Sequence, residues 1–513
     1  MIRHIDPEKD LARILKKVEN PGRYVGGEFG IRIDSNAIFR VGVCFPDLYE
    51  IGMSNQAIAA LYGIVHQTEG AIAERVFCPA PDFEAALQEA NIPLYGLEQG
   101  TPLYAFDLLT VTLSYELSAT NVLLLLRAGG VPLFHKDRKE GDPIVLGGGP
   151  AFTNPIPLGD FFDGVFIGEA EEEFGNLLSE LVSMKRRGAG REDLLENIRE
   201  CPFIWYQGKR EKTRRAVYKN FSHTPSYTRW FPVPNLKITH DHGVVEIMRG
   251  CPNGCRFCHA GIFYRPFRMK TPALVEEEVA WEVERKGYRE ISLSSLSSGD
   301  YRGLSALVKH LNRRFKDRYV SFSLPSLHLE TFGLELLSDI SEVRKSGLTF
   351  AVETPNPLWQ LSLNKRVERE KVKQILLEAR EKGWKLAKFY FMVGLPFHET
   401  DRGRGDTGVR VRYPSIHRNP DAYQCRYLRT QTPYPLPVGR SADRGTSPSK
   451  HRDDSQGGKE SSRKGRIPGS RSLRAGGTVE PGRRAGRGGG PQGFSKRSPI
   501  RCVGRSISAC RLG

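Results

Sequence analysis

Residues 244–258 read Val-Val-Glu-Ile-Met-Arg-Gly-Cys-Pro-Asn-Gly-Cys-Arg-Phe-Cys, a short apolar strand that runs directly into three cysteines. The cysteines Cys251, Cys255 and Cys258 follow the spacing Cys-x3-Cys-x2-Cys. Three thiolates on one tight loop can hold three corners of a cubic 4Fe–4S cluster, whose closed form takes four cysteines. The fourth iron then keeps an open coordination position, which a metal centre needs in order to engage a substrate.

A structural zinc site is the alternative use of these thiols. Such sites combine two Cys or His pairs. No second pair lies nearby in the sequence, and His259 adjoins the last cysteine too closely to complete a separate tetrahedral site easily. We therefore favour the cluster. The remaining six cysteines form no comparable group and are expected to be buried or incidental thiols: Cys44, Cys78, Cys201, Cys425, Cys502 and Cys510.

The cysteine motif resembles that of the radical S-adenosylmethionine (SAM) enzymes. The resemblance implies that the open iron chelates the amino and carboxylate groups of SAM. One electron from the cluster then cleaves a carbon–sulfur bond of SAM and releases a 5′-deoxyadenosyl radical. It also implies a one-electron reductant, flavodoxin- or ferredoxin-like, as a partner.

The chain from Gly243 onward alternates strands and helices, which predicts a whole or partial (β/α) barrel with its active residues at the strand ends. The predicted strands are Val244–Met248, Glu290–Leu296, Tyr319–Leu324, Leu348–Val352 and Leu386–Val393. The predicted helices include Thr271–Lys286, Gly303–Arg314 and Glu368–Lys382.

The resemblance places SAM contacts at these strand ends and on the cysteine loop. The residues it singles out are Phe257, Ser294, Ser297, Glu353 and Gly394. Three of these positions also have a simpler interpretation. The serines lie in a stretch that reads as a turn, and Glu353 has Lys365 or Arg366 within reach for a salt bridge.

The N-terminal half predicts a parallel sheet with helices on both faces. Its predicted strands are Val41–Phe45, Leu108–Leu113, Ile144–Leu146 and Gly164–Ile167. Its predicted helices are Gln56–His66, Phe83–Ala90 and Ala119–Ala128. Ligands of such sheets bind at the carboxyl ends of the strands.

The residues at those ends resemble the cobalamin-binding domain, whose pattern is Asp-x-His-x-x-Gly, then Ser-x-Leu, then Gly-Gly. The matching positions are Asp47, Gly52, Ser114, Gly148 and Gly149. Tyr49 stands where that family has the histidine that ligates cobalt. Two interpretations stay open: cobalamin bound without this ligand, or a Rossmann-like domain that has lost the cofactor.

Two further segments follow. Ile167–Glu172 resembles the glycine–glutamate stretch that closes the cobalamin-binding domain, although a helix start with acidic residues at its positive end explains it equally well. Residues 184–240 are polar, with a charge run over 209–215, and read as a linker with a solvated face or, less favoured, a substrate-binding segment. The expected domains are 1–183, the linker 184–240, the barrel 241–399 and a tail 400–513.

The net charge of +17 belongs to the tail. Residues 401–513 carry 25 Lys and Arg against 8 Asp and Glu, so residues 1–400 are neutral and lack a global basic footprint for nucleic acid. The N-terminus has no apolar stretch of signal-peptide length, and no helix is long enough to span a bilayer. We expect a cytoplasmic protein without membrane contact.

The tail departs from the rest of the chain. It holds 21 Arg, 4 Lys and 19 Gly without a sustained period, and it begins where a barrel needs a further helix and strand. It is interpreted either as a disordered Arg/Gly-rich arm that binds RNA or as the product of a coding frame lost near codon 398, which would leave the barrel truncated. The second is favoured, and retranslating the gene in its other frames past that codon tests it.

Together these features indicate an α/β protein: a Rossmann-like domain of the cobalamin-binding type, then a partial, apparently truncated (β/α) radical SAM barrel, then a disordered tail. The expected activity is reductive cleavage of SAM with a 4Fe–4S cluster, with cobalamin as an open question and the substrate unknown. The alternatives are an iron–sulfur protein for electron transfer or sensing, and RNA binding through the tail.

Overall fold

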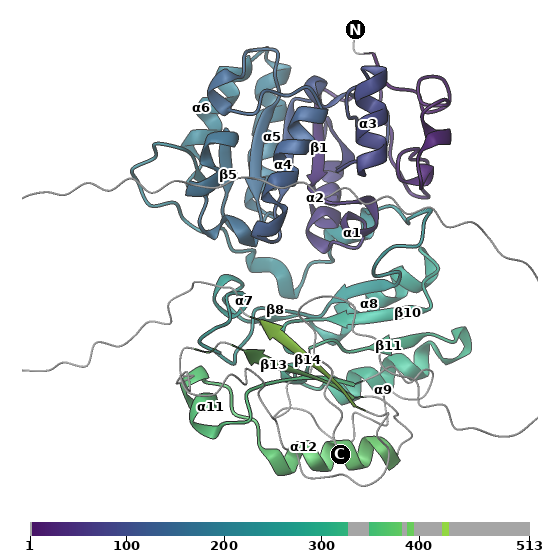
Figure 1. The fold of residues 1–513 in the computed structure, drawn as a ribbon, viewed down its shortest axis with the longest axis vertical. Coiled ribbons are helices and arrows are strands. Elements are labelled where there is room, and N and C mark those ends of the chain that lie inside the picture. The colour runs from purple at the N-terminus through teal and green to yellow at the C-terminus, as the bar shows by residue number, and fades with distance from the viewer. Residues whose placement is uncertain (1–2, 327–347, 382–386, 394, 396–422, 430–513) are drawn as a thin grey trace, which may run out of the picture. The chain divides into compact units, whose positions relative to one another are not determined.

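The chain divides by its internal contacts into two units, residues 1–431 with 506–513 and residues 432–505. Every residue described below belongs to the first unit. The computed structural model describes residues 3–326, 348–381, 387–393, 395 and 423–429 (Figure 1).

The N-terminal domain is built on a six-stranded sheet with the strand order β2-β1-β3-β4-β5-β6. The first five strands pair in parallel and β6 pairs antiparallel at the edge. The order 2-1-3-4-5 is that of a flavodoxin-like doubly wound sheet. The strands are β1 Phe39–Phe45, β2 Ala71–Phe77, β3 Leu108–Thr112, β4 Ile144–Gly148, β5 Gly164–Phe166 and β6 Ile204–Trp205.

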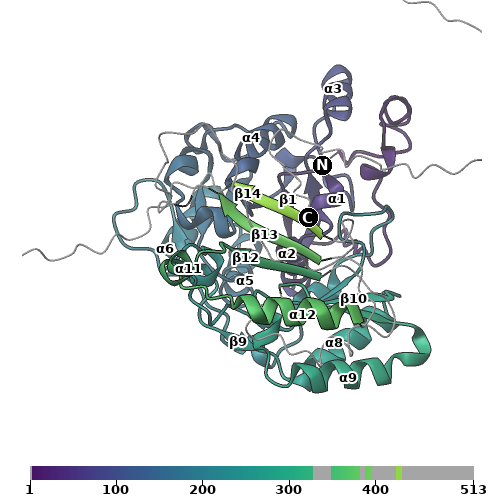
Figure 2. The ribbon, with the colours of Figure 1, turned by 60° about the horizontal axis from the view of Figure 1, so that its bottom comes forward.

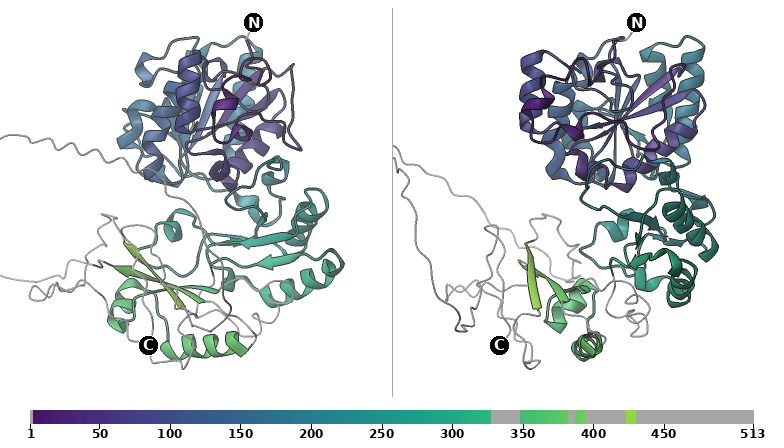
Figure 3. Two further views of the ribbon diagram at one scale, coloured as in Figure 1. Left: turned by 45° about the vertical axis from the view of Figure 1, so that its right-hand side comes forward. Right: turned by 90° about the vertical axis from the view of Figure 1, so that its right-hand side faces the viewer.

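Helices cover both faces of this sheet, as Figure 3 shows in its right-hand view. The sheet therefore has two cores. Val41 and Val43 pack with α2, α5 and α6, whereas Cys44 and its neighbours on the opposite face pack with α3 and α4. This alternation along β1 is the period of a strand buried on both sides. The helices are α1 Tyr49–Gly52, α2 Gln56–Gln67, α3 Pro81–Ala90, α4 Ala119–Ala128, α5 Glu173–Arg186 and α6 Arg191–Glu200.

Two strands of this sheet, β2 and the short edge strand β6, were not predicted from the sequence. Strand β2 contains Glu74 and Arg75, and both side chains are fully buried. Glu74 accepts hydrogen bonds from the backbone of Gln99 and from Thr101. Two adjacent charged residues interrupt the apolar pattern by which a buried strand is predicted. The partners that make their burial possible lie far away in the sequence.

The expected linker 184–240 requires a correction. Helix α6 and strand β6 lie inside it, and Leu194, Leu195, Ile198 and Ile204 are buried in the core of the sheet. The N-terminal domain therefore extends at least to Trp205. The spacing of these four residues within a highly polar stretch is the signal that the interpretation as a linker overlooked.

The second domain contains two three-stranded parallel sheets, β11-β10-β7 and β12-β13-β14. The strands are β7 Gly243–Glu246, β10 Glu290–Ser294, β11 Ser321–Ser323, β12 Leu348–Glu353, β13 Ala387–Val393 and β14 Tyr423–Arg429. The helices are α7 Ala260–Phe263, α8 Pro272–Glu284, α9 Leu304–Arg314, α11 Pro357–Leu363 and α12 Arg369–Glu381. A short hairpin pairs β8 Met248–Arg249 with β9 Arg268–Met269.

One hydrophobic core joins the two small sheets. Val245, Leu293 and Phe322 of the first sheet belong to the same buried cluster as Phe350 and Phe389 of the second. The break in pairing falls between β11 and β12, where residues 327–347 lie outside the described part. The strands thus follow each other in the order of a partial barrel, and all five predicted strands are present.

A sixth strand continues this series. β14 pairs in parallel with β13 over seven residues, Ala387↔Tyr423 to Val393↔Arg429 (Figure 2). It lies in the stretch that was expected to be a tail without secondary structure, beyond the point of the expected truncation. The strand therefore corrects that expectation for Tyr423–Arg429, while the remainder of the tail lies outside the described residues.

Candidate functional site

The cysteine loop lies between the two strands of the β8–β9 hairpin, at the carboxyl end of the first small sheet. Ser294, the last residue of β10, pairs with Glu246 at the end of β7, so the serine-rich stretch and the cysteine loop start from the same edge. All three loop cysteines are free thiols of intermediate exposure. The predicted ligands therefore stand where a barrel places its chemistry.

Asn253 ties this loop to the neighbouring strand end. Its side-chain amide donates to Ser297 Oγ at 3.1 Å and to Asp300 Oδ2 at 2.8 Å, and it lies 3.4 Å from Cys251 Sγ. Ser297 in turn donates to the same Asp300 oxygen at 2.7 Å. Asn253 and Asp300 were not predicted; the Asn between two cysteines and the Asp after the serines were the available signals.

The far side of the loop rests on the end of α11. Arg256 donates to the carbonyls of Leu361 and Ser362, and Asn364 donates to the carbonyls of Asn253 and Gly254. The last carbonyls of a helix have no partner within the helix, so a guanidinium satisfies them. These contacts hold the loop from two sides.

The donor set fits a cluster. Burial raises the pKa of Cys255, the charge of Lys365 opposes this rise, and the thiols of Cys258 and Cys251 add to it. A cation beside the thiols favours the thiolate that iron requires. Within the described residues, no three His, Cys, Asp or Glu side chains are close enough to surround a single metal ion. In a 4Fe–4S cube each thiolate ligates a different iron.

The predicted SAM residues have different surroundings. Ser294 lines a cavity, described below, and Ser297 is buried in the Asn253 network. Lys365 Nζ lies 5.9 Å from the ring centre of Phe257. Gly394 lies outside the described residues.

Glu353 forms the expected salt bridge, and its contact with SAM stays a prediction. Its carboxylate pairs with Lys365 at 2.8 Å, and both side chains are about nine-tenths buried. Its backbone has φ +65° and the register of β12 shifts beside it, so a bulge turns the residue at the strand end. The salt bridge lies next to the cysteine loop, since Lys365 Nζ is 5.9 Å from the ring centre of Phe257. There Lys365 lowers the pKa of Cys255 and Glu353 raises it.

The cobalamin-like residues do not gather in one place. Gly148 and Gly149 line a cavity of about 360 Å³, whereas Asp47, Gly52 and Ser114 are not among its lining residues. Asp47 accepts a hydrogen bond from the hydroxyl of Tyr115 at 2.8 Å, and Ser114 accepts one from Asn55 at 3.2 Å. A Cβ on Gly52 would lie 2.2 Å from the ring of Phe77, so close packing explains this glycine.

Tyr49 belongs to the interior of the N-terminal domain. It is 2% exposed, its ring packs edge-on against Phe77, and its hydroxyl donates to Glu28 at 2.9 Å. Burial, followed by the charge of Glu28, raises the pKa of Tyr49. The residue that replaces the ligand histidine is therefore a neutral core residue that does not line the cavity.

The cavity itself joins the two domains. Its walls include Gly148 and Gly149 after β4, Glu169 after β5, and Arg249 and Ser294 from the second domain. Both sets of strand ends thus contribute to one pocket. The size lies at the lower end of the range for small-molecule sites.

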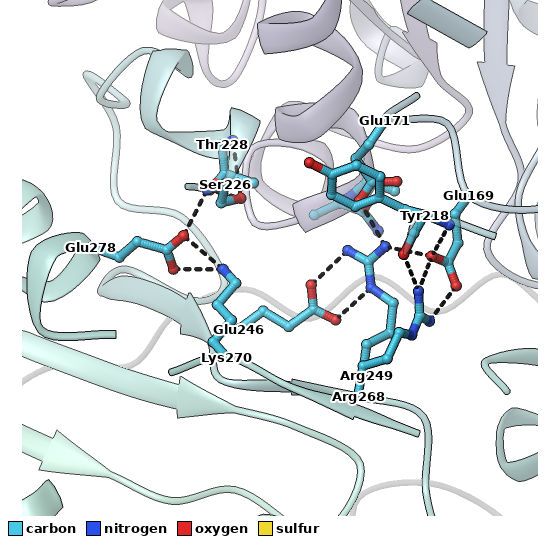
Figure 4. A network of polar contacts seen from close by, with 12 residues as sticks. Glu169, Glu171, Tyr218, Ser226, Thr228, Glu246, Arg249, Arg268, Lys270 and Glu278 are labelled. Atoms are coloured by element: carbon cyan, nitrogen blue, oxygen red, sulfur yellow. Dashed lines mark hydrogen bonds and ion pairs between the residues drawn. The ribbon is translucent and has the colours of Figure 1, made fainter. Parts of the chain in front are cut away.

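An ion-pair network forms one side of this cavity (Figure 4). Arg249 lies between Glu246 at 2.8 Å and Glu171 at 2.7 Å, and Arg268 binds Glu169 at 2.6 Å. Burial by itself would raise the pKa of Glu169, but Arg268 and Arg249 outweigh it and the net shift is downward. The acidic stretch also leads directly into α5, whose N-cap is Glu172, so the expected helix start with acidic residues is present beside the ion pairs of Glu169 and Glu171.

Among the described residues, none of the helices combines the length and the apolar character that crossing a bilayer requires.

Comparison with known proteins agrees with both domains. A sequence profile for "Radical SAM proteins, N-terminal" matches residues 57–206, and the profile of the radical SAM superfamily matches residues 245–404. The Methanocaldococcus jannaschii protein described as "Uncharacterized protein MJ0966" is 26% identical over 319 residues. That match covers 61% of this chain and 64% of the relative, so the chain spans less than two thirds of its length.

Solved structures with a similar fold include two enzymes. One is the radical SAM methyltransferase TsrM from Kitasatospora setae with cobalamin and a 4Fe–4S cluster bound, at 14% identity and a TM-score of 0.48 over 69% of this chain and 67% of that one. The other is the cobalamin-dependent radical SAM enzyme OxsB, at 13% identity and 0.46 over 69% and 49%. The two profiles thus identify a radical SAM N-terminal domain over residues 57–206 and a radical SAM domain over residues 245–404, and the cysteine loop lies inside the second.

Proposed function

We propose that this chain binds a 4Fe–4S cluster through Cys251, Cys255 and Cys258 and cleaves SAM reductively. The observation that carries the proposal is the loop itself: three thiols between two anchoring surfaces, at the strand ends of a partial barrel. When bound, the cluster would pass one electron from an external reductant into the C5′–S bond of SAM, giving methionine and a 5′-deoxyadenosyl radical.

The protein's own residues would prepare this site. Asn253, Ser297 and Asp300 fix the first half of the loop, and Arg256 and Asn364 fix the second. Lys365, which the buried Glu353 holds in place, opposes the rise that burial causes in the pKa of Cys255. Ser294, Ser295 and the backbone of Leu296 line the cavity and would offer donors and acceptors to the amino acid part of SAM.

Anaerobic reconstitution with iron and sulfide tests the proposal. We expect an electron paramagnetic resonance (EPR) signal of a reduced 4Fe–4S cluster, and 5′-deoxyadenosine once SAM and a reductant are added. Replacing each of the three loop cysteines with alanine should abolish both. Cys201→Ala is the matched control, because this half-buried thiol lies in the N-terminal domain and should change neither.

Each other outcome has a definite meaning. A cluster without 5′-deoxyadenosine would identify an electron-transfer or sensing protein. Tetrahedral zinc, or no metal in the loop, would end the radical SAM proposal for this chain. A flavodoxin- or ferredoxin-like protein should replace the chemical reductant.

Cobalamin is a second candidate ligand, supported by the 2-1-3-4-5 sheet and by the glycine turn that lines the cavity. Gly149 has φ +107°, and a Cβ there would lie 2.6 Å from the carbonyl of Leu113. Histidine is absent from the described lining of the cavity, and Tyr49 points elsewhere. A cobalamin bound here would therefore have no histidine ligand to cobalt among the described lining residues.

Titration with hydroxocobalamin, followed by absorbance after gel filtration, tests this candidate. Gly148→Leu should prevent binding, because a Cβ at Gly148 meets nothing closer than 3.8 Å and the larger side chain can enter the cavity without straining the backbone. Equal binding by this variant, or none by the native protein, would favour a domain that kept the fold and lost the cofactor. 5′-Deoxyadenosine formation without cobalamin separates this question from the main proposal.

A further inference from the structure

Two arginines face each other at the neck of the cysteine loop. In the β8–β9 hairpin Arg249 pairs with Arg268 in antiparallel register, and residues 250–267 between them carry all three cysteines. Like charges directly opposite each other on neighbouring strands destabilise their pairing. The neck of the loop therefore needs a counter-charge to stay closed.

Glu169 of the N-terminal domain supplies that charge to both arginines. Its two carboxylate oxygens accept from Arg268 at 2.6 and 2.7 Å, and one of them also accepts from Arg249 at 3.2 Å. The backbone N–H of Tyr218 donates to the same carboxylate at 2.9 Å. The contact with Arg268 is the bidentate fork that gives a carboxylate–guanidinium pair its strength and its fixed geometry.

The contact is shielded from solvent, so its loss would be costly. The side chain of Glu169 is 5% exposed and those of Arg268 and Arg249 are 10% and 15% exposed, so water cannot readily replace a lost partner. Breaking a buried pair by removing one partner leaves an uncompensated charge, which is costly. Both guanidinium groups also lie over the ring of Phe221: that of Arg249 is 4.7 Å from the ring centre and that of Arg268 is 5.6 Å from it.

We propose that Glu169 is a positioning residue that closes the neck of the cysteine loop from the N-terminal domain. This inference rests on the proposed function of that loop. It makes the N-terminal domain a working part of the cluster site. It also connects the cavity to the cluster, because Glu169, Arg249 and Gly250 line the cavity and Gly250 immediately precedes Cys251.

Hydrogen exchange of the full-length protein tests the closure without any cofactor. In Glu169→Gln the amides of residues 248–269 should exchange about tenfold faster, since one charge-assisted contact of this kind is lost. Glu180→Gln is the matched control: it removes a carboxylate from an exposed pair with Arg187 in the same domain and should change nothing in the loop. Unchanged exchange in Glu169→Gln would overturn the proposal.

The cluster provides the second readout. In the reconstituted protein Glu169→Gln should keep its iron, shift the EPR line shape and midpoint potential of the cluster, and raise the KM for SAM about tenfold with a smaller effect on kcat. Glu169→Asp keeps the charge and should recover part of each change. A merely structural role would lower stability and leave the line shape, the potential and the KM as they are.

A milder variant tests the proposal in case Glu169→Gln does not fold. Arg268→Lys keeps a cation but loses the fork, so it should speed exchange of the loop by a smaller factor while circular dichroism stays native. If its loop exchange is unchanged, the proposal fails. If native protein shows no 5′-deoxyadenosine yet the exchange effects appear, the proposed function fails and the closure stands.

Discussion

A single histidine should make the N-terminal domain sensitive to acid. Burial, aided by Arg32 and Arg75, lowers the pKa of His66 from 6.5 to about 3, and its Nε2 has no hydrogen-bond partner among the described residues. The folded state thus holds His66 neutral, and unfolding takes up a proton at any pH between these values. The contribution of neutral His66 to the free energy of unfolding is therefore fully present above pH 6.5 and is lost as the pH falls towards 3.

We expect the free energy of unfolding to fall by up to about 1.4 kcal/mol for each pH unit in that window on account of His66. Denaturant titrations from pH 7 to pH 4 measure the slope. His66→Phe keeps a ring next to Tyr62 and should remove this share of it. Identical slopes in the two proteins would contradict the assignment.

The buried Glu28–Arg75–Glu98 cluster should be the most sensitive polar site of the same domain. Arg75 contacts Glu28 at 2.7 Å and Glu98 at 2.6 Å, with the side chains 0–2% exposed. Glu28→Ala would leave part of the guanidinium charge and the Tyr49 hydroxyl without partners, so we expect a loss of about 3–5 kcal/mol.

Denaturant unfolding followed by near-UV circular dichroism measures that loss. Glu84→Ala is the control, since it breaks a largely exposed pair with Arg127 and should cost under about 1 kcal/mol. Similar losses in both variants would show that burial does not set the cost.

At the scale of single residues, the sequence predicts a site where the spacing of the residues is itself typical of one kind of ligand. Cys251, Cys255 and Cys258 could be proposed as ligands because three thiols at short range have few other uses. Glu169 could not, because its partners Arg249 and Arg268 lie about eighty and a hundred residues away and only the folded chain brings them together. Asn253 was missed for a related reason, as an amide carries no signature of its own.

The short helix α1 shows why a motif glycine can have a packing role. Gly52 ends α1, and a Cβ there would lie 2.2 and 2.4 Å from two ring carbons of the buried Phe77. We expect Gly52→Ala to cost about 1–3 kcal/mol through overpacking. Cobalamin titration of the folded fraction should stay unchanged, since Gly52 does not line the cavity.

Gly175→Ala in α5 is the matched control for that change. Its Cβ would meet only Ile64 at 3.6 Å, an ordinary contact, and alanine favours a helix by up to about 1 kcal/mol. Denaturant unfolding should therefore move in opposite directions for the two variants. If both variants stabilise the domain, the ring of Phe77 yields and packing is not the role of Gly52.

Elements could be predicted where burial follows a period. The helix α4 was predicted with its observed bounds, and the five barrel strands were found, because their apolar residues repeat at helical or strand spacing. β2 was not predicted because Glu74 and Arg75 interrupt its apolar run. β14 was not predicted because the strand it pairs with among the described residues, β13, lies about thirty residues earlier. In both cases a distant partner decides the structure.

For the whole molecule, charge separates the described domains from the last part of the chain. Residues 432–513 carry a net charge of +13, whereas residues 1–400 are neutral. A stretch of such charge attracts RNA by releasing counterions, whether it evolved as an RNA-binding arm or arose from a lost reading frame. Salt-dependent binding alone therefore does not separate these two origins.

We expect the full chain to bind single-stranded RNA with an affinity that falls steeply between 50 and 200 mM salt, and a chain ending at residue 431 to lose this binding. The cysteine loop and every described strand precede that residue, so the shortened chain should keep its melting temperature, iron content and 5′-deoxyadenosine formation. Filter binding and calorimetry on both chains measure this. RNA binding that survives the deletion would place the basic site in the 209–215 run, and a lower melting temperature would make the last part of the chain a structural component of the enzyme.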